Sequence, residues 1–239
     1  MRISVVIPAL DEAVDLPATV GALREHEPPP FEVIVADGGS SDGTREWLGR
    51  EATDGWLRVV DAERGRGRQM NAGAAVATGD VLVFLHADAT LPPRSLEQVT
   101  RAFDDAAVRG GAFTIRFKRE PGSPLSMPVI ARGINFRTWV TATATGDQAI
   151  FVRREDFEAL GGYEPWPLFE DVDIVTRIRR LGKFKILKGP VTISDRRYRT
   201  FGPWRTAGLM WWLRALYLRG VPADELKRRF VDVRLRRQS

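Results

Sequence analysis

The segment Val81-Leu82-Val83-Phe84-Leu85-His86-Ala87-Asp88 joins an apolar run to two side chains that can bind metal ions. Five apolar residues in succession predict a strand buried on both faces over residues 81–85. His86 and Asp88 follow at its carboxyl end. Because alternate residues of a strand share a face, we expect both side chains to point at the same place. Ligands bind at this edge in open α/β sheets, so the segment predicts a buried sheet with a binding site at its edge.

The residues before this segment alternate between apolar runs and stretches that suit helices. Strands are expected at 3–7, 31–36 and 56–60, and helices at 14–24, 44–50 and 70–77. This order predicts an α/β protein with a mostly parallel central sheet, right-handed crossovers and flanking helices.

The second half of the chain is less regular. Residues 110–118 and 146–153 predict strands, and 171–181 predicts a helix whose apolar stripe runs to Leu181. At 100° per residue, Asp171 lies at the start of this helix on the side of the apolar stripe. Its carboxylate is therefore expected to point into the protein.

Composition narrows the class of protein. The chain has 239 residues, enough for one large domain or two small ones, and it contains no cysteine. Disulfides, thiolate zinc sites and cysteine nucleophiles are therefore excluded. The amino terminus enters a strand directly, and its apolar run is too short for a signal peptide, so a cytoplasmic protein is expected.

The charge distribution argues against a nucleic-acid partner. The formal net charge is +5, but residues 196–239 alone hold twelve Lys or Arg and only three acids. The basic charge therefore belongs to this tail and not to a groove on the core, and no nucleic acid is expected to bind.

Four segments place polar residues at strand ends or a helix start: 7–12, 36–44, 86–88 and 168–173. Asp37 ends its predicted strand and precedes two glycines. An acid there can accept hydrogen bonds from a ribose or nucleobase, or it can simply close the turn. Asp171 has a similar alternative, as a helix N-cap or dipole partner.

In this order the four segments resemble the family 2 glycosyltransferases, which are inverting enzymes with the nucleotide-sugar-binding fold called GT-A. The motifs are Ile7-Pro8-Ala9-Leu10-Asp11-Glu12, the acid-Gly-Gly-Ser-x-Asp-Gly-Thr turn that starts at Asp37, the acid-bearing strand end, and Glu170-Asp171-Val172-Asp173. The resemblance covers residues 1–195, with a nucleotide-binding half at about 1–105 and an acceptor half at about 106–195. Residues 196–239 form a basic, Trp-rich helical extension.

The resemblance implies a role for each matching residue. Asp171 is the catalytic general base, and a divalent cation, Mn²⁺ or Mg²⁺, is held by Asp88 and His86. Glycine spacing makes Arg64, Arg66 and Arg68 candidates for the phosphates, although the same run can be a solvated loop. The nucleotide-binding residues are expected to be Pro8, Ala9, Glu12, Asp37, Arg68, Ala87 and Asp88, and the acceptor-binding residues Asp147, Gln148 and Glu170.

Two departures from the family pattern affect these expectations. The third motif usually reads Asp-x-Asp, whereas His86 stands first here; an imidazole favours softer ions than Mg²⁺, and it can instead be a packed strand-end residue. Processive members carry Gln/Arg-x-x-Arg-Trp after the acidic helix. The nearest match, Arg196-Arg197-Tyr198-Arg199, has no following tryptophan, so one sugar is expected to be transferred per reaction.

The tail predicts a helix over 206–218 that is apolar nearly all round but too short to span a bilayer. Tryptophans and arginines over 203–220 suit a peripheral membrane interface at the inner face, which would favour a lipid-linked acceptor. Packing against the core or against a second copy, as a homodimer, is the alternative.

The function expected from the resemblance is metal-assisted, inverting transfer of one sugar from a nucleoside diphosphate sugar, with UDP-sugar favoured, to a small-molecule or lipid-linked acceptor. The ending also resembles that of a short bacterial subgroup associated with arsenosugar biosynthesis. Two alternatives are a nucleotidyltransferase on a related fold and a non-catalytic membrane-surface binding protein with a vestigial nucleotide site. The first alternative is disfavoured because the opening lacks a glycine-rich segment with Arg and Lys.

Overall fold

A computed structural model describes residues 1–230. Its strands are β1 Ile3–Ala9, β2 Glu32–Asp37, β3 Leu57–Asp61, β4 Val81–Phe84, β5 Ala89–Thr90, β6 Val108–Phe117, β7 Ile150–Arg153 and β8 Lys183–Ile193. Its helices are α1 Leu16–Arg24, α2 Thr44–Glu51, α3 Arg66–Val76, α4 Ser95–Ala102, α5 Met127–Thr141, the 3₁₀ turn Gly146–Gln148, α6 Arg154–Ala159, α7 Glu170–Leu181, α8 Arg196–Phe201, α9 Pro203–Leu218 and α10 Ala223–Arg229.

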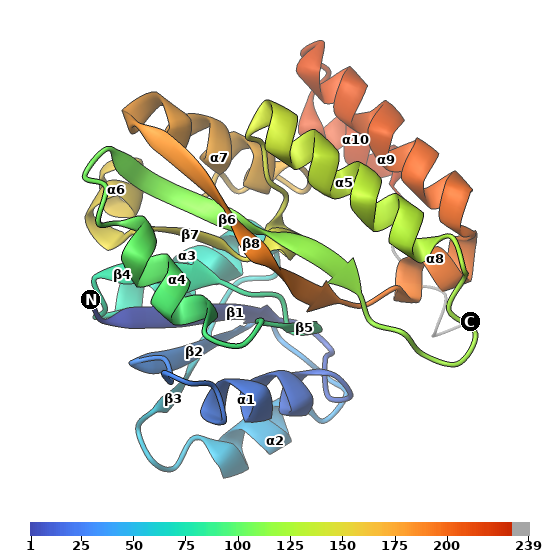
Figure 1. The fold of residues 1–239 in the computed structure, drawn as a ribbon. Helices are drawn as coiled ribbons and strands as arrows, with labels where there is room; N and C mark the ends of the chain where they lie inside the picture. The colour runs from blue at the N-terminus through green and yellow to red at the C-terminus, as the bar shows by residue number, and fades with distance from the viewer. Residues whose placement is uncertain (231–239) are drawn as a thin grey trace.

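All these strands form one twisted sheet in the order β3-β2-β1-β4-β7-β6-β8-β5 (Figure 1). The pairings among β3, β2, β1 and β4 are parallel, as is β6 with β8. β7 runs antiparallel to both of its neighbours, and β5 runs antiparallel to β8. The predicted α/β fold with a mostly parallel sheet is confirmed.

Each face of the sheet has its own apolar core, because alternate strand residues point to opposite faces. Val5 and Ile7 of β1 pack with α1, α2, α4 and α5, whereas Val6 packs with α3, α6 and α7. Both faces of the central strands are therefore covered by helices, which explains their continuous apolar runs.

The structure corrects three details of the sequence prediction. Strand β4 ends at Phe84, one residue early. Residues 146–148 form a 3₁₀ turn, and β7 starts only at Ile150, so the predicted strand over 146–153 is wrong in its first part. Leu181 is 42% exposed and lies outside the core, because α7 ends there.

At the amino edge of the sheet, a buried carboxylate is held by a full set of donors. Glu32 Oε1 accepts hydrogen bonds from Ser4 Oγ at 2.7 Å and from the backbone N–H and hydroxyl of Thr78 at 2.7 and 2.9 Å. Its other oxygen, Oε2, accepts from Arg58 Nη1 at 3.1 Å. These bonds tie β1, β2, β3 and the start of β4 together.

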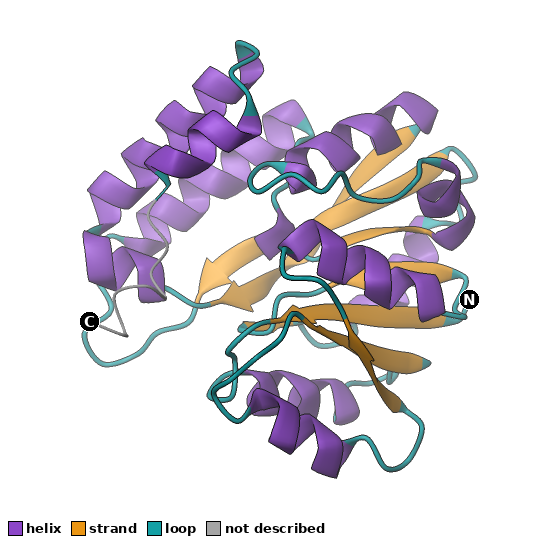
Figure 2. Ribbon diagram, turned by 180° about the vertical axis from the view of Figure 1, so that it is seen from behind, coloured by secondary structure: helices purple, strands orange, loops and turns teal. Residues whose placement is uncertain are grey.

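The C-terminal helices α8, α9 and α10 pack against the core. Leu213 of α9 and Leu226 of α10 are fully buried in a cluster with Leu168, Phe169 and Val172 at the start of α7. Helices α5 and α9 run side by side, at the opposite end of the molecule from α1 and α2 (Figures 1 and 2). No helix within residues 1–230 has the length and apolar character needed to cross a bilayer.

Candidate active site

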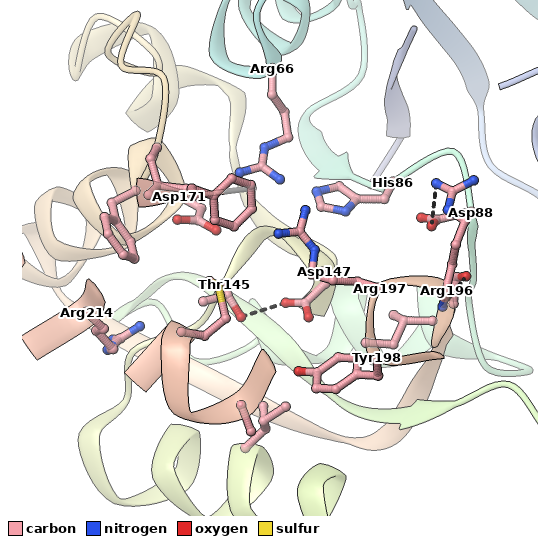
Figure 3. Close-up of a pocket in the computed structure, with 18 of the residues that line it drawn as sticks. Arg66, His86, Asp88, Thr145, Asp147, Asp171, Arg196, Arg197, Tyr198 and Arg214 are labelled. Atoms are coloured by element: carbon pink, nitrogen blue, oxygen red, sulfur yellow. Dashed lines mark hydrogen bonds and ion pairs between the residues drawn. The ribbon is translucent and has the colours of Figure 1, made fainter. Parts of the chain in front are cut away.

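A cavity of about 770 Å³ opens where the carboxyl ends of β1 and β4 meet the start of α7 and the helices α5, α8 and α9 (Figure 3). It is the place that the strand-end pattern predicts. Seven of the predicted site residues line it: Pro8, Glu12, His86, Ala87, Asp88, Asp147 and Asp171. The fold thus brings together residues that are up to 163 positions apart in the chain.

Three residues predicted to bind the nucleotide lie outside the cavity lining. Asp37 is 1% exposed and accepts hydrogen bonds from the backbone N–H groups of Gly39 and Ser40, so it closes the turn after β2. Ala9 is buried and its carbonyl accepts from Gly38 N–H. Arg68 is exposed on α3 and pairs with Glu63 at 2.9 Å.

Two residues predicted to bind the acceptor also lie behind the lining. The Gln148 side chain is buried and bonds Thr138 Oγ1, the Thr145 N–H and the Phe113 carbonyl, so it braces the 3₁₀ turn against α5 and β6. Glu170 is 1% exposed and forms an ion pair with Arg66. Only Asp147 of this predicted set faces the cavity.

His86 and Asp88 do not point at the same place. β4 ends at Phe84, so the alternation of a strand no longer applies two residues later. The His86 ring reaches into the cavity, whereas Asp88 faces Arg196 (Figure 3). The expected common direction of the two side chains is therefore wrong.

Arg196, at the start of α8, bridges to three acids of the first ninety residues. Its guanidinium nitrogens lie 3.2 Å from Asp15 Oδ2, 3.7 Å from Asp88 Oδ2 and 3.8 Å from Glu12 Oε2. This segment was predicted only as a poor match to a processivity motif. In the fold it joins the C-terminal extension directly to the strand-end acids.

Asp171 is held in a defined orientation at the first turn of α7. It is 7% exposed, and its Oδ2 accepts a hydrogen bond from the Gly146 N–H at 2.7 Å. A Cβ at Gly146 would lie 2.9 Å from His86 Nε2 and 3.4 Å from Asp171 Oδ2. Glycine is therefore needed for the close approach of this turn to both side chains, and the predicted inward position of Asp171 is confirmed.

Arg66 supplies positive charge beside Asp171. Its side chain projects from the first residue of α3 toward the space between Asp171 and His86 (Figure 3). Burial alone would lower the pKa of the Arg66 guanidinium, but Glu170 and Asp171 outweigh that effect and raise it. Arg66 therefore remains charged, and the carboxylates at the start of α7 have a fixed cation nearby.

Sequence reasoning missed the opposite wall of the cavity. Arg137 of α5, Tyr198 of α8 and Arg214 of α9 line it. Burial raises the pKa of Tyr198 to about 12, so its hydroxyl keeps its proton at neutral pH. One signal in the sequence was Arg214, which stands between apolar residues in the second half of α9.

The donor groups around Asp88 suit a divalent cation shared with a substrate. Among residues 1–230, no three His, Asp or Glu side chains gather closely enough to hold a metal by themselves. Hard cations such as Mg²⁺ commonly take one or two carboxylates from the protein and complete their shell with phosphate oxygens and water. Asp88 borders the cavity and is part-exposed there, so its carboxylate fits as the protein ligand of such an ion.

A sheet of parallel strands with acids at its carboxyl edge, next to a cavity with arginines, defines an α/β protein of the nucleotide-sugar-binding class. Residues 4–161 match the family model "Glycosyl transferase family 2". The chain therefore belongs to glycosyl transferase family 2, and the prediction of that family is confirmed.

Similar proteins agree with this family. The chain is 32% identical to an undecaprenyl-phosphate mannosyltransferase of Micrococcus luteus, over 82% of this chain and 85% of that protein. It is 29% identical to an uncharacterized glycosyltransferase of Nostoc sp., over 79% of this chain but only 62% of the relative's length. The mannosyltransferase PcManGT from Pyrobaculum calidifontis, solved with GDP-Man and Mn²⁺, matches 93% of this chain and 65% of its own, with a TM-score of 0.64 and 24% identity. This last likeness shows the GT-A fold.

Proposed function

We propose that the protein transfers one sugar from a nucleoside diphosphate sugar to an acceptor hydroxyl, with inversion and with Asp171 as general base. The observation that carries this proposal is the buried carboxylate of Asp171, fixed by the Gly146 N–H and facing the same cavity as His86 and Asp88. A donor bound along the strand ends would place its sugar between these groups.

The chemistry of the step explains the need for a carboxylate. Attack by a hydroxyl on the anomeric carbon forms the new C–O bond, breaks the bond to the diphosphate, and releases the hydroxyl proton. Asp171 Oδ2 accepts a hydrogen bond from the Gly146 N–H, and Oδ1 accepts one from the Val172 N–H. Each carboxylate oxygen has two lone pairs, so the group retains a place for that proton. An acid at this place accounts for inversion through a single displacement.

The leaving diphosphate needs positive charge. A divalent cation held by Asp88 would neutralise developing charge on the diphosphate. Arg66, Arg64 and His86 border the same cavity and are proposed to contact the donor phosphates or sugar. Whether His86 ligates the metal remains a prediction, as do Asp37, Ala9 and Arg68 in nucleotide binding, and Gln148 and Glu170 in acceptor binding.

The first experiment identifies the nucleotide. The melting temperature is measured with UDP and GDP, each with and without Mn²⁺ or Mg²⁺, because a ligand that binds only the folded state raises it. A metal-dependent rise confined to one nucleotide is expected and identifies the donor class. No rise with either nucleotide at saturating concentration would overturn the proposed function.

The second experiment tests the base with the sugar nucleotide so identified. In hydrolysis of the donor, water takes the place of the acceptor, and the base must remove a proton from the attacking water. Asp171→Asn is expected to lower this rate by about 10²- to 10⁴-fold and to leave the nucleotide-dependent rise in melting temperature intact. Asp173→Asn is the matched control, since Asp173 lies two residues further along α7, pairs with Arg177 and is outside the cavity lining. A parental rate in Asp171→Asn would refute the base assignment.

We also propose that the acceptor is presented at a membrane surface. Large apolar side chains are exposed on both helices beside the cavity: Phe136 (68%) and Trp139 (75%) on α5, and Trp204 (63%) and Leu218 (70%) on α9. Exposed aromatics interspersed with arginines suit the headgroup region of a bilayer. The Micrococcus luteus relative is named for a lipid-linked phosphate, which agrees with this proposal.

Vesicle flotation tests the membrane proposal. The protein is expected to float with vesicles that contain anionic lipid, and Phe136→Ser with Trp139→Ser is expected to reduce the bound fraction several-fold. Val14→Ser, an exposed apolar residue outside this surface, is the control. The surface would instead be assigned to a second copy if two results are found together. The parental protein stays at the bottom of the gradient, and light scattering shows that it is a dimer which the same substitutions convert to a monomer.

A further inference from the structure

Two arginines on the wall of the cavity have no acidic partner among the described residues 1–230. Arg137 projects from α5 and Arg214 from α9, and both line the cavity. Neither forms an ion pair with a carboxylate of residues 1–230. Arg214 Nη2 donates to Thr143 Oγ1 at 2.7 Å, and Arg137 Nη2 makes a long contact of 3.4 Å with Thr138 Oγ1.

Parts of both guanidinium groups are buried without a hydrogen-bond acceptor. Arg137 Nε and Arg214 Nη1 are inaccessible to solvent and have no acceptor among residues 1–230, and Arg214 as a whole is only 9% exposed. A buried charged donor without an acceptor costs free energy, so such groups are rare unless a ligand completes them.

The electrostatics confirm that this wall is short of negative charge. Burial, and then the nearby Arg137, lower the pKa of Arg214 to about 10. Burial likewise lowers the pKa of Arg137, and Asp147 and Asp171 offset that effect only in part. The fold thus brings two like charges close together inside the protein.

Three other arginines at or near the cavity are paired with acids. Arg66 pairs with Glu170, Arg177 with Asp173 at 2.6 Å, and Arg196 with three acids. Arg137 and Arg214 differ from these three arginines, because each is largely buried and forms no ion pair with a carboxylate of residues 1–230.

We propose that Arg137 and Arg214 form a binding site for an anionic group of the acceptor, and that this group is a phosphate monoester. The inference rests on the proposed function. Guanidinium groups present paired N–H donors that match phosphate oxygens, and two of them together suit a doubly charged group. The phosphate anchors the acceptor, and the attacking atom is a hydroxyl on the same molecule, whose proton passes to Asp171.

The position of the two arginines separates this site from the donor phosphates. Asp88 and Arg196 lie at one side of the cavity and Arg214 at the other, with Asp171 toward the Arg214 side (Figure 3). Apolar residues such as Ile130 of α5 and Met210 and Trp211 of α9 line the same wall. An acyl or isoprenoid chain attached to the phosphate would therefore find apolar contacts as it leaves the cavity.

Binding measurements test the proposal without any need for transfer. Calorimetry with glycerol 3-phosphate and with lysophosphatidic acid compares a small and a lipid source of the same headgroup, and glycerol and monoacylglycerol are the phosphate-free controls. Arg137→Gln and Arg214→Gln are each expected to raise the dissociation constant for at least one phosphate probe tenfold or more. Tighter binding of lysophosphatidic acid assigns the site to a lipid, and equal binding assigns it to a small phosphate.

Matched variants exclude a general charge effect or misfolding. Arg132→Gln on α5 and Arg205→Gln on α9 remove exposed arginines of the same helices outside the cavity lining, and both are expected to keep dissociation constants within twofold. Arg214→Lys retains the charge and is expected to bind more tightly than Arg214→Gln. Thermal melts confirm that each variant is folded.

Three results would overturn the inference. The first is parental binding of both phosphate probes in Arg137→Gln and Arg214→Gln, and the second is absence of any phosphate binding by the parent protein. The third is a result in which Arg137→Gln and Arg214→Gln lose binding of UDP or GDP but keep binding of glycerol 3-phosphate. That result would assign the two arginines to the donor. The proposed function would survive the first two results if nucleotide binding and the Asp171→Asn effect stand.

Discussion

Glu32 and Arg214 are both buried charged residues, yet the protein treats them in opposite ways. Glu32, at the amino edge of the sheet, accepts hydrogen bonds from three residues that belong to different strands and loops. Arg214, in the cavity wall, has one hydroxyl acceptor and a second arginine as neighbour. A buried charge with a full set of partners supports the fold, whereas the proposal made above assigns the incompletely paired Arg214 to a ligand.

Of the substitutions that test this comparison, Glu32→Gln is expected to change the free energy of unfolding most. The NH₂ group of the glutamine cannot accept the hydrogen bond that Arg58 donates to the second carboxylate oxygen. The remaining bonds, from Ser4 and Thr78, become weaker because their acceptor is no longer charged. We expect the free energy of unfolding to fall by about 2 kcal/mol, with nucleotide binding unchanged. Urea denaturation measures the first quantity. A stability equal to that of the parent would break the comparison.

The pH dependence of stability provides a smaller effect at the same residue. Burial alone would raise the pKa of Glu32, but the hydrogen bonds from Thr78, Ser4 and Arg58 outweigh it and lower the pKa below 4.5. A lowered folded-state pKa means that the stabilisation is complete above pH 4.5 and is lost as the pH falls through the folded-state value. The stability difference between the parent and Glu32→Gln is therefore expected to narrow on acidification, and a constant difference from pH 7 to pH 3 would contradict it.

The smallest expected effect is a rise in the free energy of unfolding, in Arg214→Met, where Glu32→Gln lowers it. Arg214→Met replaces a buried guanidinium, whose set of hydrogen-bond acceptors is incomplete, by an apolar side chain. The substitution also removes the hydrogen bond to Thr143. We expect the free energy of unfolding to rise by about 1 kcal/mol. Arg205→Met, on the exposed side of α9, serves as control and should change it little. Destabilisation by Arg214→Met would mean that this arginine supports the fold as Glu32 does.

Much of the first hundred residues could be predicted from the sequence. The cores of β1, β2 and β4 are apolar runs because both faces of these strands are buried, and their alternation with helical stretches predicted a mostly parallel sheet. Glu170 and Asp171 were placed correctly at a helix start. The positions of Pro8, Glu12 and Asp88 at the cavity followed from the rule that parallel strands end at a common edge.

The opposite wall was not predictable by the same reasoning. Helix α5 carries exposed apolar residues on one side and Gly133 in its middle, so its sequence has no clear amphipathic period. Its packing against α9 joins segments about 70 residues apart, and no local pattern records that contact. The direction of His86 was missed because β4 ends before it, a boundary that apolar residues alone do not mark.

Because the chain is synthesised from its amino terminus, the ion pairs of Arg196 and the part of the cavity wall formed by α9 can form only late in synthesis. Domains begin to fold from the amino-terminal side during translation, so β1 to β4 can assemble while residues beyond 195 are still being made. Until then Glu12, Asp15 and Asp88 have no Arg196 to neutralise them, and the cavity lacks Arg214. A nascent chain therefore carries an open, acidic strand edge, which α8 and α9 cover once they have been made and have folded.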